Sequence, residues 1–234
     1  MTTYLIFAII PLLLGMYAQF KIQSAYNKYS SVRTQTGVSG WEAARKMLDR
    51  HGLNDIRIEK VNGTLTDHYA PNELTLRLSE GVYNSNSIAA VGVACHEAGH
   101  AYQHAEKYAP LKLRTAIVPV VNIGSHLGMI LFTIGLLFAG LSENSNYTIS
   151  KIGLILFSMT AVFAIITLPV EFDASRRAKA WLSDSGLLFD NEMDGISAVL
   201  DAAALTYVSA AVQAIANVLY YASILSSRER RNKR

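Results

Sequence analysis

Four long apolar runs constrain the fold of this chain more than any other feature. They cover Tyr4–Phe20, Ile117–Leu141, Ile152–Val170 and Ala202–Leu225. A bilayer core about 30 Å thick requires about 20 apolar residues of helix. The second and third runs meet this length and contain no Asp, Glu, Lys or Arg. Runs of this kind are difficult to bury in a soluble protein of 234 residues, so we predict an integral membrane protein. No cleavage pattern follows the first run, which we interpret as an anchor.

The fourth run carries polar side chains at helical spacing. They are Thr206, Ser209, Gln213, Asn217 and Tyr220. Such a stripe fits a spanning helix packed inside a bundle, and it also fits a helix that lies at the membrane interface. Both alternatives stay open, and we therefore expect three to four transmembrane helices.

The residues between the first two runs have a mixed polarity that predicts a small α+β region. A capping box and a glycine stop predict a helix over Gly40–His51. Alternating apolar residues predict strands at Ile56–Glu59 and Leu74–Leu78. Ser87 is predicted to cap a second helix, which runs from Ile88 to about Lys107.

This second helix contains the motif His96-Glu97-Ala98-Gly99-His100. Histidines four residues apart project from one helix face and can bind one ion at about 2.0–2.1 Å. Glu97 follows the first histidine and can take a proton from a water on that ion. The helical context and the small neighbours favour a metal site over a chance match. We predict one Zn²⁺ per chain, held by His96 and His100, with Glu97 as the general base.

A catalytic zinc needs a third protein ligand. The candidates are His104, Glu171, Asp173, His68 and His126. His104 lies two turns, about 11 Å, beyond His96 and is too far to share its ion. Glu171 is favoured because the hairpin of the second and third apolar runs returns the chain to the membrane face of the motif helix. The alternative is an interfacial Glu171 paired with Arg176 or Arg177.

Two motifs together resemble a known family. His96–Gln103 and Glu171–Ala178, supported by Thr66–Pro71 and Ala202–Val208, look like the YugP-like bacterial membrane zinc metallopeptidases. The resemblance covers most of the chain, although residue 70 is Ala where Asp is expected. It implies a mainly α membrane protein with a small zincin-like α+β catalytic domain. The layout is more distantly similar to the CAAX prenyl protease and heat-shock membrane metallopeptidases.

These resemblances imply that Glu171 is the third zinc ligand. Ser175 stands where the more distant proteins have Asp, so the partner that supports a ligating histidine stays open. Asp173 and Asp67 are the candidates, because such imidazoles usually donate to a carboxylate or carbonyl group. His68 and Tyr207 are further candidates for supporting the site or lining the substrate cleft.

We therefore expect an endopeptidase that acts on a protein or peptide at the membrane. The edge of the Leu74–Leu78 strand is a candidate for binding the substrate as an added strand. Two alternatives stay open: a non-catalytic membrane scaffold or adaptor with a structural metal, and a metal-dependent hydrolase of non-peptide acyl substrates. The basic tail after the last apolar run is more typical of a membrane protein than of a nucleic-acid binder, and the sequence leaves the oligomeric state open.

Basic residues near the membrane ends predict the orientation in a bacterial plasma membrane. Those on the side of the motif are Lys21, Lys28, Arg33, Lys112, Arg114, Arg176, Arg177 and Lys179, whereas Ser142–Ser150 has none. This distribution places the catalytic face in the cytoplasm, although the basic tail conflicts with it if the fourth run spans.

We expect five segments along the chain: an N-terminal anchor at residues 1–20, an α+β region with the motif helix at 21–113, a transmembrane hairpin at 114–170, a third-ligand helix and loop at 171–201, and a fourth apolar helix with a basic tail at 202–234.

Overall fold

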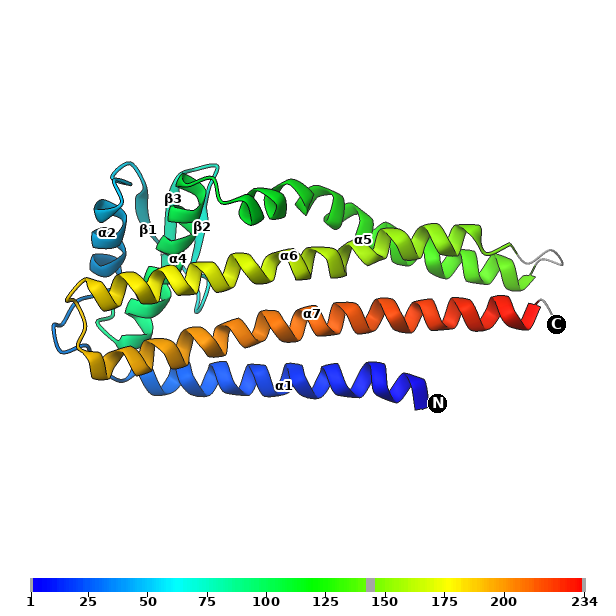
Figure 1. Cartoon of the computed structure of the whole chain (residues 1–234), viewed down its shortest axis with the longest axis horizontal. Helices are drawn as coiled ribbons and strands as arrows, with labels where there is room; N and C mark the ends of the chain where they lie inside the picture. Colours follow the sequence, from blue (N-terminus) through cyan, green and yellow to red (C-terminus); the bar gives the residue numbers. More distant parts are fainter. Residues whose placement is uncertain (1, 142–145, 233–234) are drawn as a thin grey trace. The chain divides into compact units, whose positions relative to one another are not determined.

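The computed structural model describes residues 2–141 and 146–232 and contains seven helices and three strands (Figure 1). Two compact units make up the chain. We call Ala18–Lys112 with Leu168–Thr206 the mixed unit. The apolar unit takes in the first 17 residues, Leu113–Thr167 and the chain from Tyr207 onward.

The sheet of the mixed unit has three strands in the order β1-β3-β2. They are β1 (Arg57–Val61), β2 (His68–Ala70) and β3 (Thr75–Ser79). The central strand, β3, pairs in parallel with β1 and antiparallel with β2. Leu76 and Leu78 of β3 are fully buried, so the middle of the sheet belongs to the core.

This topology adds a strand that the sequence does not predict, and it corrects one prediction. β2 was not predicted as a strand, because three residues are too few to show a clear alternation. The strand predicted at Leu74–Leu78 corresponds to β3, and β3 has a neighbour on each side. The prediction that its edge receives the substrate is therefore wrong, and the edges of the sheet are β1 and β2.

The helices beside the sheet begin at the caps that the sequence predicts. At the start of α2 (Gly40–Arg50), the Glu42 carboxylate accepts from the Ser39 N–H at 2.8 Å, and the Ser39 hydroxyl accepts from the Glu42 N–H. The Ala90 N–H donates to the Ser87 hydroxyl at 3.2 Å, just inside α4 (Ile88–Ala105). The short helix α3 (Glu80–Tyr83) follows β3 directly. These caps satisfy N–H groups that the first helical turn leaves without partners.

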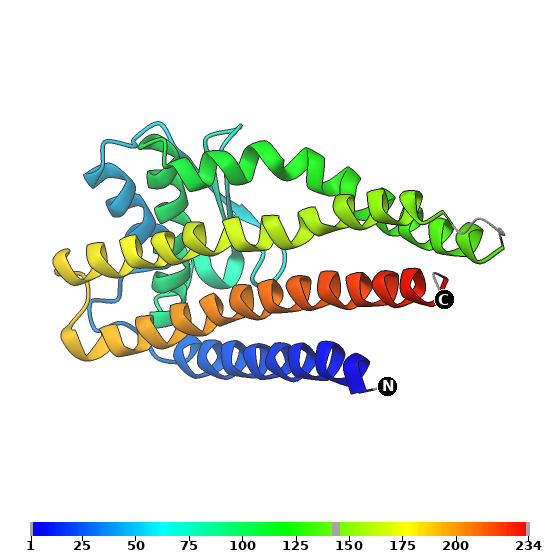
Figure 2. The ribbon, with the colours of Figure 1, turned by 45° about the vertical axis from the view of Figure 1, so that its right-hand side comes forward.

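The core of the mixed unit joins the sheet and α2 to α4, the end of α6 (Thr148–Asp184) and the start of α7 (Asp190–Asn232). Figure 2 shows α4 beside this end of α6. The largest fully buried apolar side chains come from all these elements: Met47, Leu48, Leu76, Leu78, Val82, Val91, Val170, Leu182, Ile196, Val199 and Leu200. The hydrophobic effect therefore holds α4 and α6 together where the motif lies.

Four helices are long and apolar enough to cross a membrane: α1 (Thr2–Ser30), α5 (Ala109–Leu141), α6 and α7. On α1, the apolar side chains Ile10, Leu13 and Met16 are each more than half exposed, as suits a surface in contact with lipid. The protein is a mainly α membrane protein with a small α+β part, as the sequence predicts.

Within the apolar unit, α5 and α6 approach closely at glycines. A Cβ atom on Gly135 would lie 2.4 Å from the Ser150 nitrogen, and one on Gly153 would lie 2.3 Å from the Phe132 nitrogen. Only glycine allows backbones to pack at this separation. Such small-residue contacts are common between membrane helices, where lipid supplies little hydrophobic drive for association.

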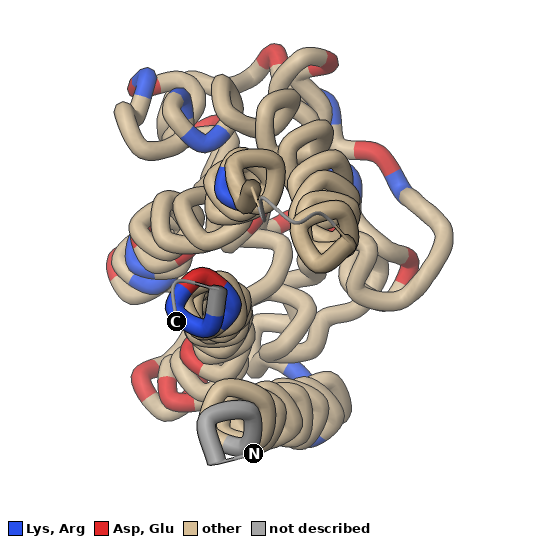
Figure 3. The backbone as a smooth tube through the Cα atoms, turned by 90° about the vertical axis from the view of Figure 1, so that its right-hand side faces the viewer, with Lys and Arg blue, Asp and Glu red and all other residues tan. Residues whose placement is uncertain are grey.

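The fourth apolar run forms part of one continuous helix, α7. Its apolar window is 44 % buried, against 11–28 % for the other three spans. In its polar stripe, the Gln213 amide donates to the Asn217 side-chain oxygen at 2.9 Å. This burial favours the alternative in which the stripe packs inside a bundle. The last turn contains Arg230 and Arg231, and Figure 3 shows blue segments, with a red one between them, in the part of the tube near the C label.

Candidate metal centre

Two helices of the mixed unit bring His96, His100 and Glu171 together. His96 and His100 lie one turn apart on α4, and Glu171 faces them from α6. The Glu171 Oε2 atom lies 3.3 Å from His96 Nε2 and 3.4 Å from His100 Nε2. The side chains are 12 %, 11 % and 3 % exposed for His96, His100 and Glu171. They form a buried group whose possible ligand atoms lie within 4.8 Å of one another.

The close approach of α4 to α6 depends on Gly99. A Cβ atom at this position would lie 2.8 Å from the backbone oxygen of Ala174, which is closer than real Cβ contacts. Ala98 and Ala174 are themselves fully buried. The small residues of the motif thus bring the backbone of α4 against α6, and the histidine and glutamate side chains can then meet.

A buried glutamine holds the ring of His100. The Nδ1 atom of His100 lies 3.0 Å from the side-chain oxygen of Gln103, which can only accept, so Nδ1 carries a proton. The Gln103 amide nitrogen donates to the Val170 carbonyl at 2.8 Å and to Asp173 Oδ2 at 2.9 Å. Gln103 is fully buried. This network leaves Nε2, the atom that faces Glu171, as the nitrogen with a lone pair in the neutral ring.

Ser175 lies beside Nδ1 of His96, as Gln103 lies beside Nδ1 of His100. Its hydroxyl oxygen lies 3.0 Å from His96 Nδ1 and can accept a hydrogen bond from it. Both imidazoles therefore present Nε2 to Glu171 and use Nδ1 for a neighbour. Partners of this kind fix the orientation of metal-binding histidines in proteins.

Asp173 pairs with Arg176 and Arg177, the arginines that the sequence offers as partners for Glu171. It accepts from Arg177 Nε at 2.5 Å and also from Arg176, while Arg177 donates to Glu106 at 2.7 Å. The same carboxylate accepts from Gln103. Gln103 thus links Asp173 to the His100 ring.

The donor set fits a zinc ion. Zinc in proteins binds imidazole nitrogen and carboxylate oxygen at about 2.0–2.2 Å in a tetrahedral arrangement. Tetrahedral donors at this radius lie about 3.3–3.5 Å apart, and the two nitrogen–oxygen distances here are 3.3 and 3.4 Å. Two neutral imidazoles and one carboxylate are also a ligand set used by catalytic zinc, with a fourth position left for water.

The electrostatics of the group favour a positively charged occupant. Burial raises the pKa of Glu97, and His100 and His96 lower it by less. Burial also acts to lower the pKa of His100, but the hydrogen bond with Glu171 and the charges of Glu97 and Glu171 outweigh it and raise this pKa. The carboxyl groups of Glu97 and Glu171 thus lie near the two imidazoles in a buried site. Their negative charge can be balanced either by protons or by a metal cation.

The remaining candidate residues lie outside this group. Asp67 accepts from the Ser79 N–H at 2.7 Å and from its hydroxyl, so it joins β2 to the end of β3. His68 is exposed and contacts the Thr66 carbonyl. His104 contacts the Tyr69 hydroxyl at 2.9 Å.

Two candidates belong to the apolar unit. The ring of His126 contacts the backbone oxygen of Asn122, four residues earlier on α5, at 3.0 Å. Tyr207 is half-buried on α7, and its part in lining a substrate cleft stays a prediction.

Sequence reasoning missed the contacts of Gln103 and Ser175. Gln103 had a detectable signal, because it shares the helix face of His96 and His100 and is a polar residue in a helix of small apolar ones. Ser175 had none, because a serine in place of an expected aspartate predicts the loss of a carboxylate partner for the histidine. In the structure, its hydroxyl lies beside the histidine ring.

The fold and this donor group define a membrane protein with a possible metal centre, and the comparisons with known proteins agree. Residues 4–226 match a family described as "putative neutral zinc metallopeptidase". The chain therefore belongs to this family, which confirms the resemblance. It is 46 % identical over 221 residues to the "putative membrane protease YugP" of Bacillus subtilis (strain 168), covering 94 % of this chain and 96 % of that protein. No solved structure matches the chain.

Proposed function

We propose that this protein is a membrane-embedded zinc endopeptidase in which His96, His100 and Glu171 hold one zinc ion per chain. The observation that supports this most directly is the pair of distances from Glu171 Oε2 to the two Nε2 atoms, 3.3 and 3.4 Å. Both match the separation of donors around a tetrahedral zinc. Gln103 and Ser175 keep the Nε2 atoms turned toward this point.

A zinc ion held there would act as a Lewis acid that lowers the pKa of the attacking water and polarises the scissile carbonyl. We assign the proton transfers to Glu97, which directly follows His96 on α4. Its carboxylate takes a proton from the attacking water and gives it to the leaving nitrogen. The raised pKa of Glu97 suits both steps, since a group must be able to hold the proton between them.

We further propose that an extended peptide pairs with the outer edge of β2, in place of the edge of β3 that the sequence suggested. No strand in the described ranges pairs with this edge. Asp67, just before β2, is close enough to raise the pKa of Glu97, and Tyr69 of β2 contacts His104 at the far end of α4. β2 therefore runs along the turns of α4 that carry the motif.

This mode of binding depends on hydrogen bonds to the substrate backbone. N-methylation at positions flanking the cleaved bond removes the backbone N–H groups that the peptide would donate to β2. We expect such peptides to be cleaved at least about tenfold more slowly. Methylation of a residue far from the cleaved bond is the control. Equal cleavage of all these peptides would exclude pairing at the β2 edge.

The basic residues near the motif favour an orientation with the centre at the cytoplasmic face of a bacterial plasma membrane. The basic last turn of α7 counts against this orientation if α7 spans, so the orientation needs its own test. Two predicted spans separate Lys107 from Lys179, so both positions should lie on one side. Cys95 is buried and is the only cysteine, which keeps the labelling background low. Single cysteines at 107 and 179 should react with an impermeant maleimide from the cytoplasmic side only, and labelling from opposite sides would contradict the topology.

The main test combines metal analysis with a cleavage assay on the purified full-length protein. We expect about one zinc per chain and casein or peptide cleavage that a chelator abolishes. Glu97→Gln keeps the shape of the side chain but cannot take a proton, so cleavage should fall at least about 100-fold while zinc remains bound. Glu80→Gln, an exposed glutamate outside the site, is the matched control and should behave as the wild type.

The outcomes separate the proposed peptidase from its alternatives. A protein that retains zinc, cleaves no peptide and is unaffected by Glu97→Gln would be a scaffold with a structural metal. Cleavage of acyl esters or lipids, but of no peptide, would indicate a hydrolase of a different substrate class. Unchanged zinc content after replacement of both His96 and His100 by Ala would refute the metal centre.

A further inference from the structure

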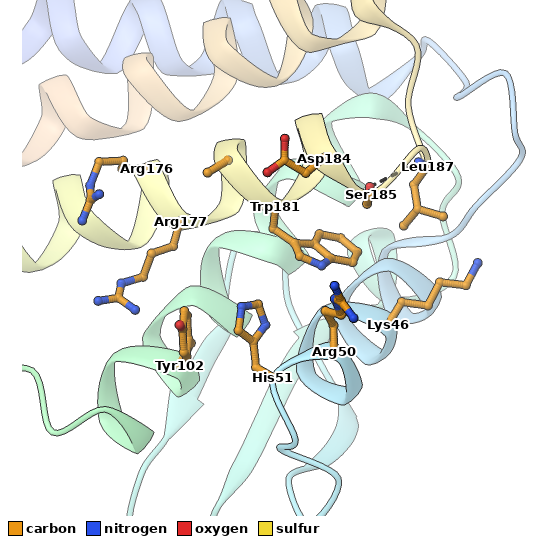
Figure 4. Close-up of a pocket in the computed structure, with 11 residues that line it drawn as sticks. Lys46, Arg50, His51, Tyr102, Arg176, Arg177, Trp181, Asp184, Ser185 and Leu187 are labelled. Carbon is orange, nitrogen blue, oxygen red and sulfur yellow. Dashed lines mark hydrogen bonds between the residues drawn. The ribbon is translucent and has the colours of Figure 1, made fainter.

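A cavity of about 630 Å³ opens in the mixed unit between α2, α4 and the end of α6. Figure 4 shows residues from these three helices around it. His96, His100 and Glu171 are not among the residues that line it, so it is a separate feature from the candidate metal centre. Its volume lies in the range of cavities that bind small molecules.

Basic side chains line the cavity from two sides. Lys46 and Arg50 lie one turn apart on α2, and Arg176 and Arg177 lie on α6. Asp184 is the only acidic residue in the lining. Positive charge therefore reaches the cavity from opposing walls, which favours an anionic ligand.

Not all of this charge is available to a ligand. Arg177 is held by Asp173 and Glu106, and Arg176 also pairs with Asp173. By contrast, Lys46 and Arg50 form no ion pair with any residue in the described part of the chain. Both are exposed, so an incoming ligand can reach them without displacing a carboxylate.

Flat side chains form another part of the lining. The rings of His51 and Tyr102 lie with their centroids 4.0 Å apart, and the guanidinium of Arg177 lies 4.5 Å from the Tyr102 centroid. The ion pairs of Arg177 with Asp173 and Glu106 hold its guanidinium beside the Tyr102 ring. Trp181 of α6 contributes a large indole ring. Flat apolar and cationic surfaces of this kind can pack against an organic group that is attached to the anion.

We propose that this cavity binds a phosphate group, with Lys46 and Arg50 as the main donors and Arg176 assisting from α6. A phosphate has oxygens that point in several directions and carries close to two negative charges. It can therefore accept hydrogen bonds from both walls at once, whereas a planar carboxylate matches a single arginine fork. The proposal does not depend on the peptidase activity.

Trp181 provides a direct readout, because it lines the cavity and the chain has only two tryptophans. We expect inorganic pyrophosphate to change the tryptophan emission of the purified full-length protein with a saturable dependence on concentration. Trp181→Phe should remove most of this change, while calorimetry should still detect binding. Acetate at the same concentration and ionic strength should give no saturable change.

The variant Lys46→Gln/Arg50→Gln should weaken pyrophosphate binding at least about tenfold, since it removes two charge-assisted hydrogen bonds. Lys60→Gln is the matched control, because it removes one charge from an exposed lysine of β1 outside the cavity and should change the affinity less than about twofold. Unaltered thermal unfolding of the double variant would show that its fold is intact.

Both soluble molecules and lipid headgroups carry phosphate, and reconstitution distinguishes these sources. In nanodiscs of neutral lipid, a response to added pyrophosphate supports a soluble ligand. A response that appears only with phosphatidylglycerol, and that needs Lys46 and Arg50, supports a headgroup. The proposal is overturned if neither probe gives a saturable response, if acetate acts equally well, or if Lys60→Gln loses as much affinity as the double variant.

Discussion

Helix α6 makes two contacts of similar closeness with different consequences. In the apolar unit, Gly135 and Gly153 let α5 and α6 approach until a Cβ would clash with backbone nitrogen. In the mixed unit, Gly99 lets α4 approach the Ala174 carbonyl in the same way. The first contact contains one buried polar side chain, Ser150, whose hydroxyl donates to the Phe132 carbonyl. Beside the second contact lie three buried polar residues of α6: Glu171, Asp173 and Ser175.

The difference shows how one packing arrangement can serve two purposes. Lipid is as apolar as the helix surfaces, so the hydrophobic effect does little to bring membrane helices together. Their association depends instead on van der Waals contact, which a close backbone approach supplies. Between α4 and α6, the same approach determines how far Glu171 lies from the two histidines. We therefore expect changes at the first contact to alter stability, and changes at the second to alter metal binding.

The largest effect on zinc content is expected when the proposed metal ligand Glu171 is removed from the α4–α6 contact. Glu171→Ala leaves two histidines for the ion, and zinc should fall from about one to below about 0.1 per chain, with loss of cleavage. Elemental analysis after dialysis measures this. Glu80→Ala is the control for removal of an exposed glutamate. If Glu171→Ala retained zinc, the α4–α6 contact would not supply a metal ligand, and its distinction from the α5–α6 contact would fail.

Gly99→Ala tests the comparison directly. The added Cβ would meet the Ala174 oxygen at 2.8 Å, so α4 and α6 must move apart. A misplacement of about 1 Å can cost about 100-fold in rate, and we expect a loss of cleavage of that order with weaker zinc binding.

Gly135→Ala is the counterpart in the apolar unit. Its Cβ would meet the Ser150 nitrogen at 2.4 Å, so the unfolding temperature should fall by about 2–8 °C, with zinc content unchanged. Equal effects of the two alanine variants on zinc affinity would contradict the distinction between the contacts.

A smaller effect is expected from the residues that support His100. Gln103→Leu keeps the volume but leaves the His100 Nδ1–H and Asp173 without their shared partner. Zinc affinity, measured by competition with a chelating dye, should fall about 10–100-fold. Asp173→Ala should act in the same range, because it releases Gln103. Wild-type affinity in both variants would show that the network does not orient the ring.

The smallest effect is expected at His104, which continues the row of His96 and His100 but contacts Tyr69. His104→Ala should change zinc affinity less than about twofold, by the same competition assay. If this variant empties the site while Glu171→Ala does not, the ligand set and the hairpin topology behind it are both wrong.

Much of the fold was predictable because its determinants are local. The apolar runs, the Ser39 and Ser87 caps and the His96–His100 spacing act within single helices, and periodicity reveals them. β2 escaped prediction because three residues carry too little pattern. The central place of β3 could not be inferred either, since strand order depends on which edges meet after the chain has folded.

The sequence by itself determined the class of the protein, the two histidines with their neighbouring glutamate, and the family. Only the tertiary structure decided which groups surround them. Gln103 reaches the Val170 carbonyl 67 residues away, Ser175 meets His96 across 79 residues, and Asp173 takes the arginines. The reason is physical: spacing along one helix places side chains on a face, but contact between two helices depends on a separation that Gly99 and Ala174 set jointly.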